Sequence, residues 1–308
     1  MSNSKTVLVL GALGGVGNSV ARAFQDKGWR VLGLVRPGRE AQLPAGMLPV
    51  TADLFDARAV AAAAGPVDIV FNGINIPYPQ WPTHLLPTFT AAADVAEVLG
   101  ARHIYPGSVY NFGANMPAQL TPQTPFAATT VKGRLRVAIE DMLRQRADAG
   151  SLRTIVVRAG DFIGDGAKNS WMSTLVAKDL KAGKITSPGG YDTVHAWAYL
   201  PDLAKVVVAL AEREALLCDY EVFHFDSHNV TMRELAAAGS AGIGRKVKLT
   251  HLPRFVFSAL GLFNPFMKAT IEMLYLWDVP HALRDDRLAE VIGNVPRTSL
   301  GDIMKTLI

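Results

Sequence analysis

The chain has little of what several protein classes require. Its 308 residues include one cysteine, Cys218, which excludes an internal disulfide framework and fits a reducing compartment. Charged residues make up only 19% against 49% hydrophobic residues, so a disordered chain is excluded. The formal net charge is +4, yet no run of five basic residues occurs, so no nucleic-acid partner is predicted.

Long apolar runs are also absent. The longest apolar region, at about 255–277, is broken by Pro265 and carries Lys268 and Glu272, which argues against a membrane span. Residues 1–5, Met-Ser-Asn-Ser-Lys, lead straight into the first predicted strand and leave no room for a signal peptide. We therefore expect a cytoplasmic protein with no membrane partner.

The most informative stretch lies near the start of the chain. An apolar run at 7–10 ends in Gly11, and the residues after Gly17 have the spacing of an amphipathic helix, which predicts a strand, a tight turn and a helix. Glycines let the backbone turn sharply and approach an anion, and the first helical N–H groups point at a phosphate. In this context we predict a dinucleotide site rather than an ordinary strand-to-helix turn. The residues of this cradle are Gly11, Leu13, Gly14, Gly15, Val16 and Gly17.

The residue after the second predicted strand, at 30–35, bears on cofactor choice. Cradles that prefer NAD carry an acidic residue about 20 positions beyond the glycines, where it holds the ribose 2′-hydroxyl. Arg36 occupies that position here, with Arg39 close behind. A guanidinium suits a 2′-phosphate, so NADP is the first choice of cofactor and NAD the second. The alternative is that Arg36 is a solvated residue at a strand end.

Strands and helices alternate through the first half. This order predicts an α/β fold with a doubly wound parallel sheet, in which ligands bind at the carboxyl ends of the strands. Arg36, Asn72 and Ser108 all fall at such ends, as does Gly11. Prolines between 77 and 87 predict an irregular loop, with a helix from Leu85. The strands are predicted at 7–10, 30–35, 48–53, 67–71 and 152–158, and a further strand with its exit loop is predicted at 102–110.

Three segments carry a family resemblance. The Gly-x-x-Gly-x-x-Gly spacing at 11–17, the segment at 104–113 (Ile-Tyr-Pro-Gly-Ser-Val-Tyr-Asn-Phe-Gly) and the segment at 158–166 resemble the short-chain dehydrogenase/reductase superfamily, in its extended epimerase/dehydratase-like branch. The resemblance spans nearly the whole chain. It implies a Rossmann-like sheet with helices on both faces and a smaller, mostly helical C-terminal substrate domain.

The resemblance also implies domain bounds and cofactor contacts. Residues 1–160 form the dinucleotide-binding domain, which also receives a strand near 220–226, and residues 161–219 and 227–308 form the substrate side. Asp53 would lie beside the adenine ring, although a cap on the helix that follows is the alternative. The cofactor contacts that it implies beyond the cradle and Arg36 are Asp53, Leu54, Asn72, Gly73 and Arg158.

The catalytic motif of that branch departs from its usual form here. Ser108 matches the place of the catalytic serine, and the family then needs Tyr-x-x-x-Lys, because a phenol with pKa near ~10 needs a lysine one turn away to act as acid and base. Phe126 stands in the tyrosine position. Lys132 either holds the cofactor ribose or is a solvated lysine on an amphipathic helix. Tyr110 is the candidate substitute, with ordinary packing as its alternative.

The substrate side offers further candidates. The resemblance places a substrate loop after the strand at 152–158, and the chain returns to the pocket near residue 195. Asp161 either contacts substrate or caps a turn. His224 and His228 lie in a strand and turn rather than on one helical face, so no metal site is predicted. The substrate candidates are Asp161, Asn169, Trp171, His195 and Tyr199.

Two functions fit these residues. The first is an NADP-binding, atypical extended short-chain dehydrogenase/reductase that acts as an oxidoreductase or epimerase/dehydratase on a small-molecule substrate. The second is a catalytically inactive, cofactor-sensing regulator similar to the NmrA-like proteins, which the missing tyrosine favours. Amphipathic helices near 85–99 and 126–148 are candidates for a homodimer interface of the kind the family often forms.

Overall fold

A seven-stranded parallel sheet organises the chain. The computed structural model describes residues 4–168 and 170–308, and the strand order is β11-β7-β5-β4-β1-β2-β3. Every pairing in this sheet is parallel, which confirms the predicted doubly wound α/β fold. The order changes direction between β1 and β4, the place where such sheets bind ligands. The strands are β1 Thr6–Leu10, β2 Arg30–Val35, β3 Leu48–Thr51, β4 Ile69–Asn72, β5 Arg102–Ser108, β7 Arg153–Ala159 and β11 Tyr220–His224.

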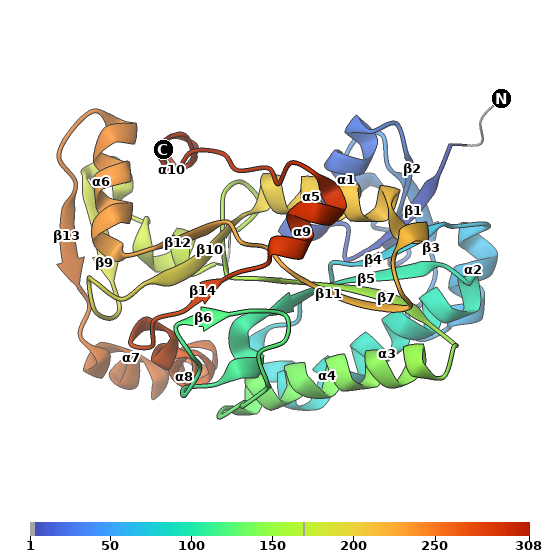
Figure 1. Cartoon of the computed structure of the whole chain (residues 1–308), viewed down its shortest axis with the longest axis horizontal. Coiled ribbons are helices and arrows are strands. Elements are labelled where there is room, and N and C mark those ends of the chain that lie inside the picture. The colour runs from blue at the N-terminus through green and yellow to red at the C-terminus, as the bar shows by residue number, and fades with distance from the viewer. Residues whose placement is uncertain (1–3, 169) are drawn as a thin grey trace.

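Helices cover both faces of the sheet (Figure 1). One face carries α2, α3 and α4, whose apolar side chains pack against Leu8, Leu10 and Tyr105 of the strands. The other carries α1, α5 and α9, which pack against Val7, Val9 and neighbouring strand residues. The helices are α1 Gly15–Asp26, α2 Ala57–Ala64, α3 Trp81–Leu99, α4 Val131–Asp148, α5 Leu200–Glu212 and α9 Asp286–Ile292.

A second, smaller lobe lies beyond the carboxyl ends of the strands, at the left of Figure 1. Its core holds Trp197, Phe257 and Trp277. It contains a three-stranded sheet in the order β12-β10-β8 and the parallel pair β9–β13, while β6 pairs with β14 nearby. Its elements are β6 Gln119–Leu120, β8 Asp161–Ile163, β9 Lys184–Ser187, β10 His195–Tyr199, β12 His228–Val230, α6 Met232–Ile243, β13 Lys248–His251, α7 Arg254–Gly261, α8 Pro265–Ile271, β14 Ala282–Leu283 and α10 Leu300–Lys305.

Two helices differ from the sequence prediction. Helix α3 begins at Trp81 rather than near Leu85, because Pro82 lies in its first turn, where a missing N–H removes no helical hydrogen bond. The sequence also predicts one helix over about 254–277, but this stretch is not one helix in the structure. Asn264 accepts hydrogen bonds from two backbone N–H groups and begins α8 as a separate helix after α7.

Helix α5 also lies elsewhere than the sequence suggested. Residues 161–219 were expected on the substrate side, but α5 packs against α1, and Leu203, Val206 and Val207 lie in the core on that face of the sheet. The reason is its apolar face, since this helix is buried on the side that meets the strands.

Three buried histidines predict a pH-dependent stability. Burial lowers the pKa values of His103, His224 and His281 to about 3. Each imidazole therefore stays neutral in the folded protein, whereas the unfolded chain binds a proton below about pH 6.5. Stability is thus full above about pH 6.5 and falls as the pH drops toward 3.

We expect His103→Leu to flatten this dependence. His103 is fully buried, and neither ring nitrogen has a partner among the described residues. Without the His103 imidazole, the unfolded chain binds about one proton fewer relative to the folded chain. The slope of the unfolding free energy against pH therefore falls by ~1.4 kcal/mol per pH unit. Urea unfolding between pH 7 and pH 4 measures this slope. The exposed His84 is the control, because His84→Leu is expected to keep the wild-type slope; equal slopes for both variants would contradict the prediction.

Candidate active site

Three glycine backbones meet where β1 passes into α1. Gly11 has a φ of 74°, and a Cβ there would lie 2.6 Å from the Gly73 carbonyl oxygen. A Cβ on Gly17 would lie 2.4 Å from the Gly11 carbonyl oxygen, and one on Gly73 would lie 2.9 Å from the Gly17 Cα. Only residues without side chains permit this contact between β1, α1 and the end of β4.

The helix start at this turn is suited to an anion. Gly14 is the N-cap of α1, and the first backbone bond of the helix is donated by Asn18 to the Gly14 carbonyl oxygen. Among the hydrogen bonds of the described residues, none uses the N–H groups of Gly15, Val16 or Gly17. Unpaired N–H groups at the positive end of a helix dipole are what a phosphate requires.

The segment after β8 lies against this turn. A Cβ on Gly15 would lie 1.7 Å from the Gly166 carbonyl oxygen, and Gly164 and Gly166 both have positive φ angles, of 108° and 92°. The two backbones touch because both residues are glycine. Leu13 and Val16 are half-buried beside them.

The predicted cofactor-binding residues after β2, β3 and β4 differ in their surroundings. Arg36 is exposed after β2, and Asp53 is exposed after β3. Asp56, not Asp53, caps α2, so the capping alternative for Asp53 is wrong. Asn72 is fully buried, and its side-chain nitrogen has no partner among the described residues. Leu54 packs, half-buried, against the core beneath.

Arg158 points into the protein. Its guanidinium forms a buried ion pair with Glu140, with 2.6 Å between Nη2 and Oε2, and lies 4.8 Å from the ring centroid of Phe126. The Arg158 guanidinium is therefore held by Glu140, and we assign it no cofactor contact. Phe126 precedes the first residue of α4, Val131, and packs against Phe112.

Ser108 and Tyr110 lie together with a tyrosine that the sequence did not single out. The Tyr110 N–H donates to Ser108 Oγ at 3.4 Å, and the hydroxyl groups of Tyr110 and Tyr78 are 2.7 Å apart. Burial raises the pKa of Tyr78 to about 12 and that of Tyr110 well above its usual value, so both phenols are protonated at neutral pH. Tyr78 lies in the segment that follows β4. Its position after a strand end is the feature of the sequence that could have indicated a place in the site.

Lys132 is buried in the first turn of α4, so the alternative of a solvated lysine is wrong. Its ammonium donates to the Ala269 carbonyl oxygen at 2.6 Å and to the Glu272 carboxylate, and it lies 4.9 Å from the ring centroid of Tyr78. One turn further along α4, Arg136 donates to the Tyr105 hydroxyl at 2.6 Å. Helix α4 therefore places the Lys132 ammonium against Tyr78 and the Arg136 guanidinium against Tyr105.

Asp161 and His195 form a second polar pair. The distance between Asp161 Oδ2 and His195 Nε2 is 2.8 Å, and His195 Nδ1 lies 3.3 Å from the Leu276 carbonyl oxygen. Both ring nitrogens of His195 therefore face oxygen atoms. The Asp161 side chain is 14% exposed and that of His195 only 3%.

Of the remaining substrate candidates, Trp171 is linked to the Asp161–His195 pair through the Trp277 ring. The Trp277 ring stacks on His195, with 4.5 Å between ring centroids, and Trp171 meets Trp277 edge-on at 5.4 Å. Tyr199 lies beside Gly164, where a Cβ would be 2.6 Å from the Tyr199 ring. Asn169 lies outside the described residues.

Comparison with known proteins identifies the family. The model of the NAD dependent epimerase/dehydratase family matches residues 7–223. The chain belongs to this family. The match confirms the predicted resemblance, and it does not favour the regulatory alternative.

A curated relative and several solved structures are similar to this family member. The uncharacterized protein y4nL of Sinorhizobium fredii is 28% identical over 234 residues, which cover 69% of this chain and 65% of that protein. A UDP-galactose 4-epimerase structure is 15% identical, with TM-score 0.72 over 98% of this chain and 97% of that one. A UDP-glucose-4-epimerase from Stenotrophomonas maltophila, solved with bound NAD, is also 15% identical, with TM-score 0.76 over 99% and 97%. At these identities the structures show a shared fold.

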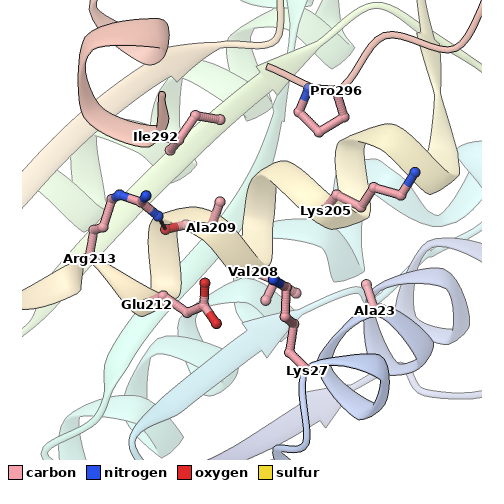
Figure 2. Close-up of a pocket in the computed structure, with 9 residues that line it drawn as sticks. All are labelled: Ala23, Lys27, Lys205, Val208, Ala209, Glu212, Arg213, Ile292 and Pro296. Carbon is pink, nitrogen blue, oxygen red and sulfur yellow. Dashed lines mark hydrogen bonds between the residues drawn. The ribbon is translucent and has the colours of Figure 1, made fainter. Parts of the chain in front are cut away.

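Two pockets among the described residues of this family member lie away from the predicted residues. Figure 2 shows one of about 300 Å³, lined by residues of α1, of α5 and of the end of α9. The other, of about 450 Å³, is lined by Tyr191, His251, Arg254 and their neighbours. Neither includes a predicted cofactor or catalytic residue.

Two further features are absent from the part of the chain that the structure describes. Among the helices at residues 4–168 and 170–308, none combines the length and hydropathy needed to cross a bilayer. Within the same ranges, no group of three or more His, Cys, Asp or Glu side chains is arranged to hold a metal ion.

Proposed function

We propose that this family member binds NADP and acts as an oxidoreductase or epimerase on a small-molecule substrate. The observation that carries the proposal is the meeting of Gly11, Gly17 and Gly73, which sets unpaired N–H groups of α1 beside the strand end that bears Arg36. Close backbone approach and free N–H groups suit a pyrophosphate, and an exposed guanidinium suits a 2′-phosphate.

The residues present fit a dinucleotide. The α1 turn would hold the pyrophosphate, Arg36 the 2′-phosphate, Asp53 the adenine and the buried amide of Asn72 a ribose hydroxyl. The unpartnered Asn72 nitrogen supports the last assignment, because a buried donor without an acceptor is costly. When bound, the cofactor supplies or accepts a hydride.

The acid–base part of the proposal rests on the tyrosine pair. Ser108 would polarise a substrate oxygen, and Tyr110 would exchange a proton with it while its hydroxyl stays bonded to that of Tyr78. The high pKa of both phenols keeps them in the donor form at neutral pH, and the nearby Arg136 guanidinium, which lowers the pKa of each, would favour a phenolate at this pair. Lys132 itself would reach a ribose hydroxyl only by leaving Glu272.

The substrate side is assigned by the same reasoning. Asp161 and His195, with the aromatic rings of Trp171 and Tyr199, would orient a substrate that presents a hydroxyl or carbonyl group. The similar solved structures include epimerases of UDP-sugars, so a sugar nucleotide is the first class to screen.

Assembly and location complete the proposal. We expect a cytoplasmic homodimer built on α3 and α4, which lie side by side on one face of the sheet (Figure 1) and expose Val98 and Val131. Light scattering at micromolar concentration should give the mass of a dimer. A monomer mass would contradict this interface.

Calorimetric titration with NADPH and NADH tests the cofactor assignment. We expect wild type to bind NADPH more tightly, and Arg36→Ala to weaken NADPH binding by about 10- to 100-fold, because a charge-assisted contact contributes roughly 1.5–3 kcal/mol. NADH affinity should stay unchanged. Arg58→Ala, at an exposed arginine of α2, is the control and should match wild type. If neither cofactor binds, the glycine turn is only architectural and the proposal fails.

A further inference from the structure

One end of the molecule exposes an unusual number of large apolar side chains. Three of them lie on and between α7 and α8: Phe255 is 72% exposed, Leu262 79% and Phe263 89%. Leu260 and Phe266 of the same two helices are also exposed. Exposed apolar residues scattered singly need no partner, but a cluster of this density marks an interaction surface.

The same segment carries charge of one sign. Between residues 235 and 271 the sequence contains no Asp or Glu, and it contains five basic residues: Arg245, Lys246, Lys248, Arg254 and Lys268. All five are exposed. Of these, Arg254 pairs with Asp278, whereas the ion pairs of the described residues include none with Lys246, Lys248 or Lys268.

The basic and apolar parts are neighbours. Strand β13, which carries Lys248, leads directly into α7, and both lie at the left end of Figure 1. Lys184 of β9 pairs in register with Lys248, but its ammonium forms an ion pair with Asp179 at 2.6 Å, so it adds no net charge beside this strand. We call β13, α7 and α8 together the basic–apolar end.

We propose that the basic–apolar end docks on the surface of an anionic lipid bilayer. Phe255, Leu262 and Phe263 would enter the boundary between headgroups and acyl chains, while the lysines and arginines face the anionic headgroups. Apolar burial and attraction of basic residues are the two contributions that hold a protein at such a surface. The sequence predicts no membrane partner because no segment spans a bilayer, and surface binding needs no span.

Charge argues against a second copy of the chain as the occupant, and polarity argues against nucleic acid. A second copy docked through this end would bring like charges together, since residues 235–271 hold no acidic group to pair with the partner's lysines. Nucleic acid would match the charge, but protein–nucleic acid interfaces are more polar than this one and would leave the exposed leucines without an apolar contact.

Docking would bring the candidate active site next to the lipid. Phe266 of α8 stacks on Tyr78 with 5.7 Å between ring centroids, and the Ala269 carbonyl oxygen accepts from Lys132. The proposal concerns a surface outside the proposed chemistry, and it stands whether or not NADP binds.

Vesicle sedimentation of the full chain tests the proposal. We expect it to bind vesicles of phosphatidylcholine mixed with phosphatidylserine, and to bind less at high salt and less to phosphatidylcholine alone. The double variant Leu262→Asp with Phe263→Asp should lose about tenfold or more in vesicle affinity, because two apolar side chains no longer enter the bilayer. The double variant Lys246→Glu with Lys248→Glu should also lose about tenfold or more, because each basic residue near the surface contributes roughly 1 kcal/mol.

Control variants carry the same kinds of substitution at exposed residues outside the basic–apolar end. Leu216 is 83% exposed in the turn between α5 and β11, Arg22 is exposed on α1, and Lys27 is exposed at the end of that helix. Leu216→Asp, and Arg22→Glu with Lys27→Glu, should bind vesicles like wild type. All of these side chains are exposed, so the variants should fold, and circular dichroism checks this.

Three results would overturn the proposal. One is wild type that sediments with neither vesicle. Another is a control variant that loses binding as strongly as its partner at the basic–apolar end. The third is a wild-type dimer in light scattering that Leu262→Asp with Phe263→Asp converts to monomer, which would assign the surface to a second copy.

Discussion

Glu140→Gln is expected to lower the free energy of unfolding by about 3–5 kcal/mol, the cost of leaving a buried charge without its partner. The Glu140 carboxylate accepts from Arg158 Nη2 at 2.6 Å and from the Asn111 amide at 2.8 Å. Both members of the ion pair are at most 2% exposed. His224 Nε2 lies 3.2 Å from Arg158, but a neutral imidazole does not replace the carboxylate charge.

Urea unfolding at neutral pH measures this effect, with Asp94→Asn as the control. Asp94 also pairs with an arginine at 2.6 Å, but its side chain is 45% exposed, so its loss should cost no more than about 1 kcal/mol. Replacing both buried partners, as Glu140→Leu with Arg158→Met, should cost less than Glu140→Gln alone. If Glu140→Gln and Asp94→Asn lower the free energy of unfolding equally, the buried ion pair contributes no more to stability than the exposed one, and the prediction is wrong.

Gly17→Ala is expected to lower NADPH affinity by about tenfold or more and the free energy of unfolding by about 1–3 kcal/mol. The added Cβ would lie 2.4 Å from the Gly11 carbonyl oxygen and 2.9 Å from its carbonyl carbon. The obstacle is backbone, which cannot rotate away as a side chain can, so α1 must shift. The shift moves the N–H groups of Gly15 and Val16 away from the place where a pyrophosphate would lie.

Gly301→Ala is the matched control for this variant. Gly301 lies in α10, and a Cβ there would meet nothing within 4 Å. Alanine is the better helix former, so stability should stay the same or rise by about 0.5–1 kcal/mol. Calorimetric titration with NADPH and urea unfolding of both variants separate the two cases. Wild-type NADPH affinity in Gly17→Ala would show that the turn is not the pyrophosphate site.

Local pattern sufficed for the order of strands and helices. The predicted second strand has the same bounds as β2, and the glycine-rich stretch forms the strand, turn and helix that its spacing predicts. Such features depend on residues a few positions apart, because side-chain period, caps and turn residues act within one element. Local pattern misplaced the start of α3. A proline in the first turn of a helix removes no helical hydrogen bond, whereas one further in does, so the effect of Pro82 depends on where the helix begins, which the local sequence does not fix.

The family, the sheet and the glycine turn were therefore determined by the sequence itself. The partners of the catalytic candidates were decided by the tertiary structure. Tyr78 reaches Tyr110 from another strand end, Lys132 meets Ala269 and Glu272 of the second lobe, and Arg158 turns inward to Glu140. These contacts join residues that are far apart in the chain, and a buried polar side chain takes whichever partner the packed elements bring within hydrogen-bond distance.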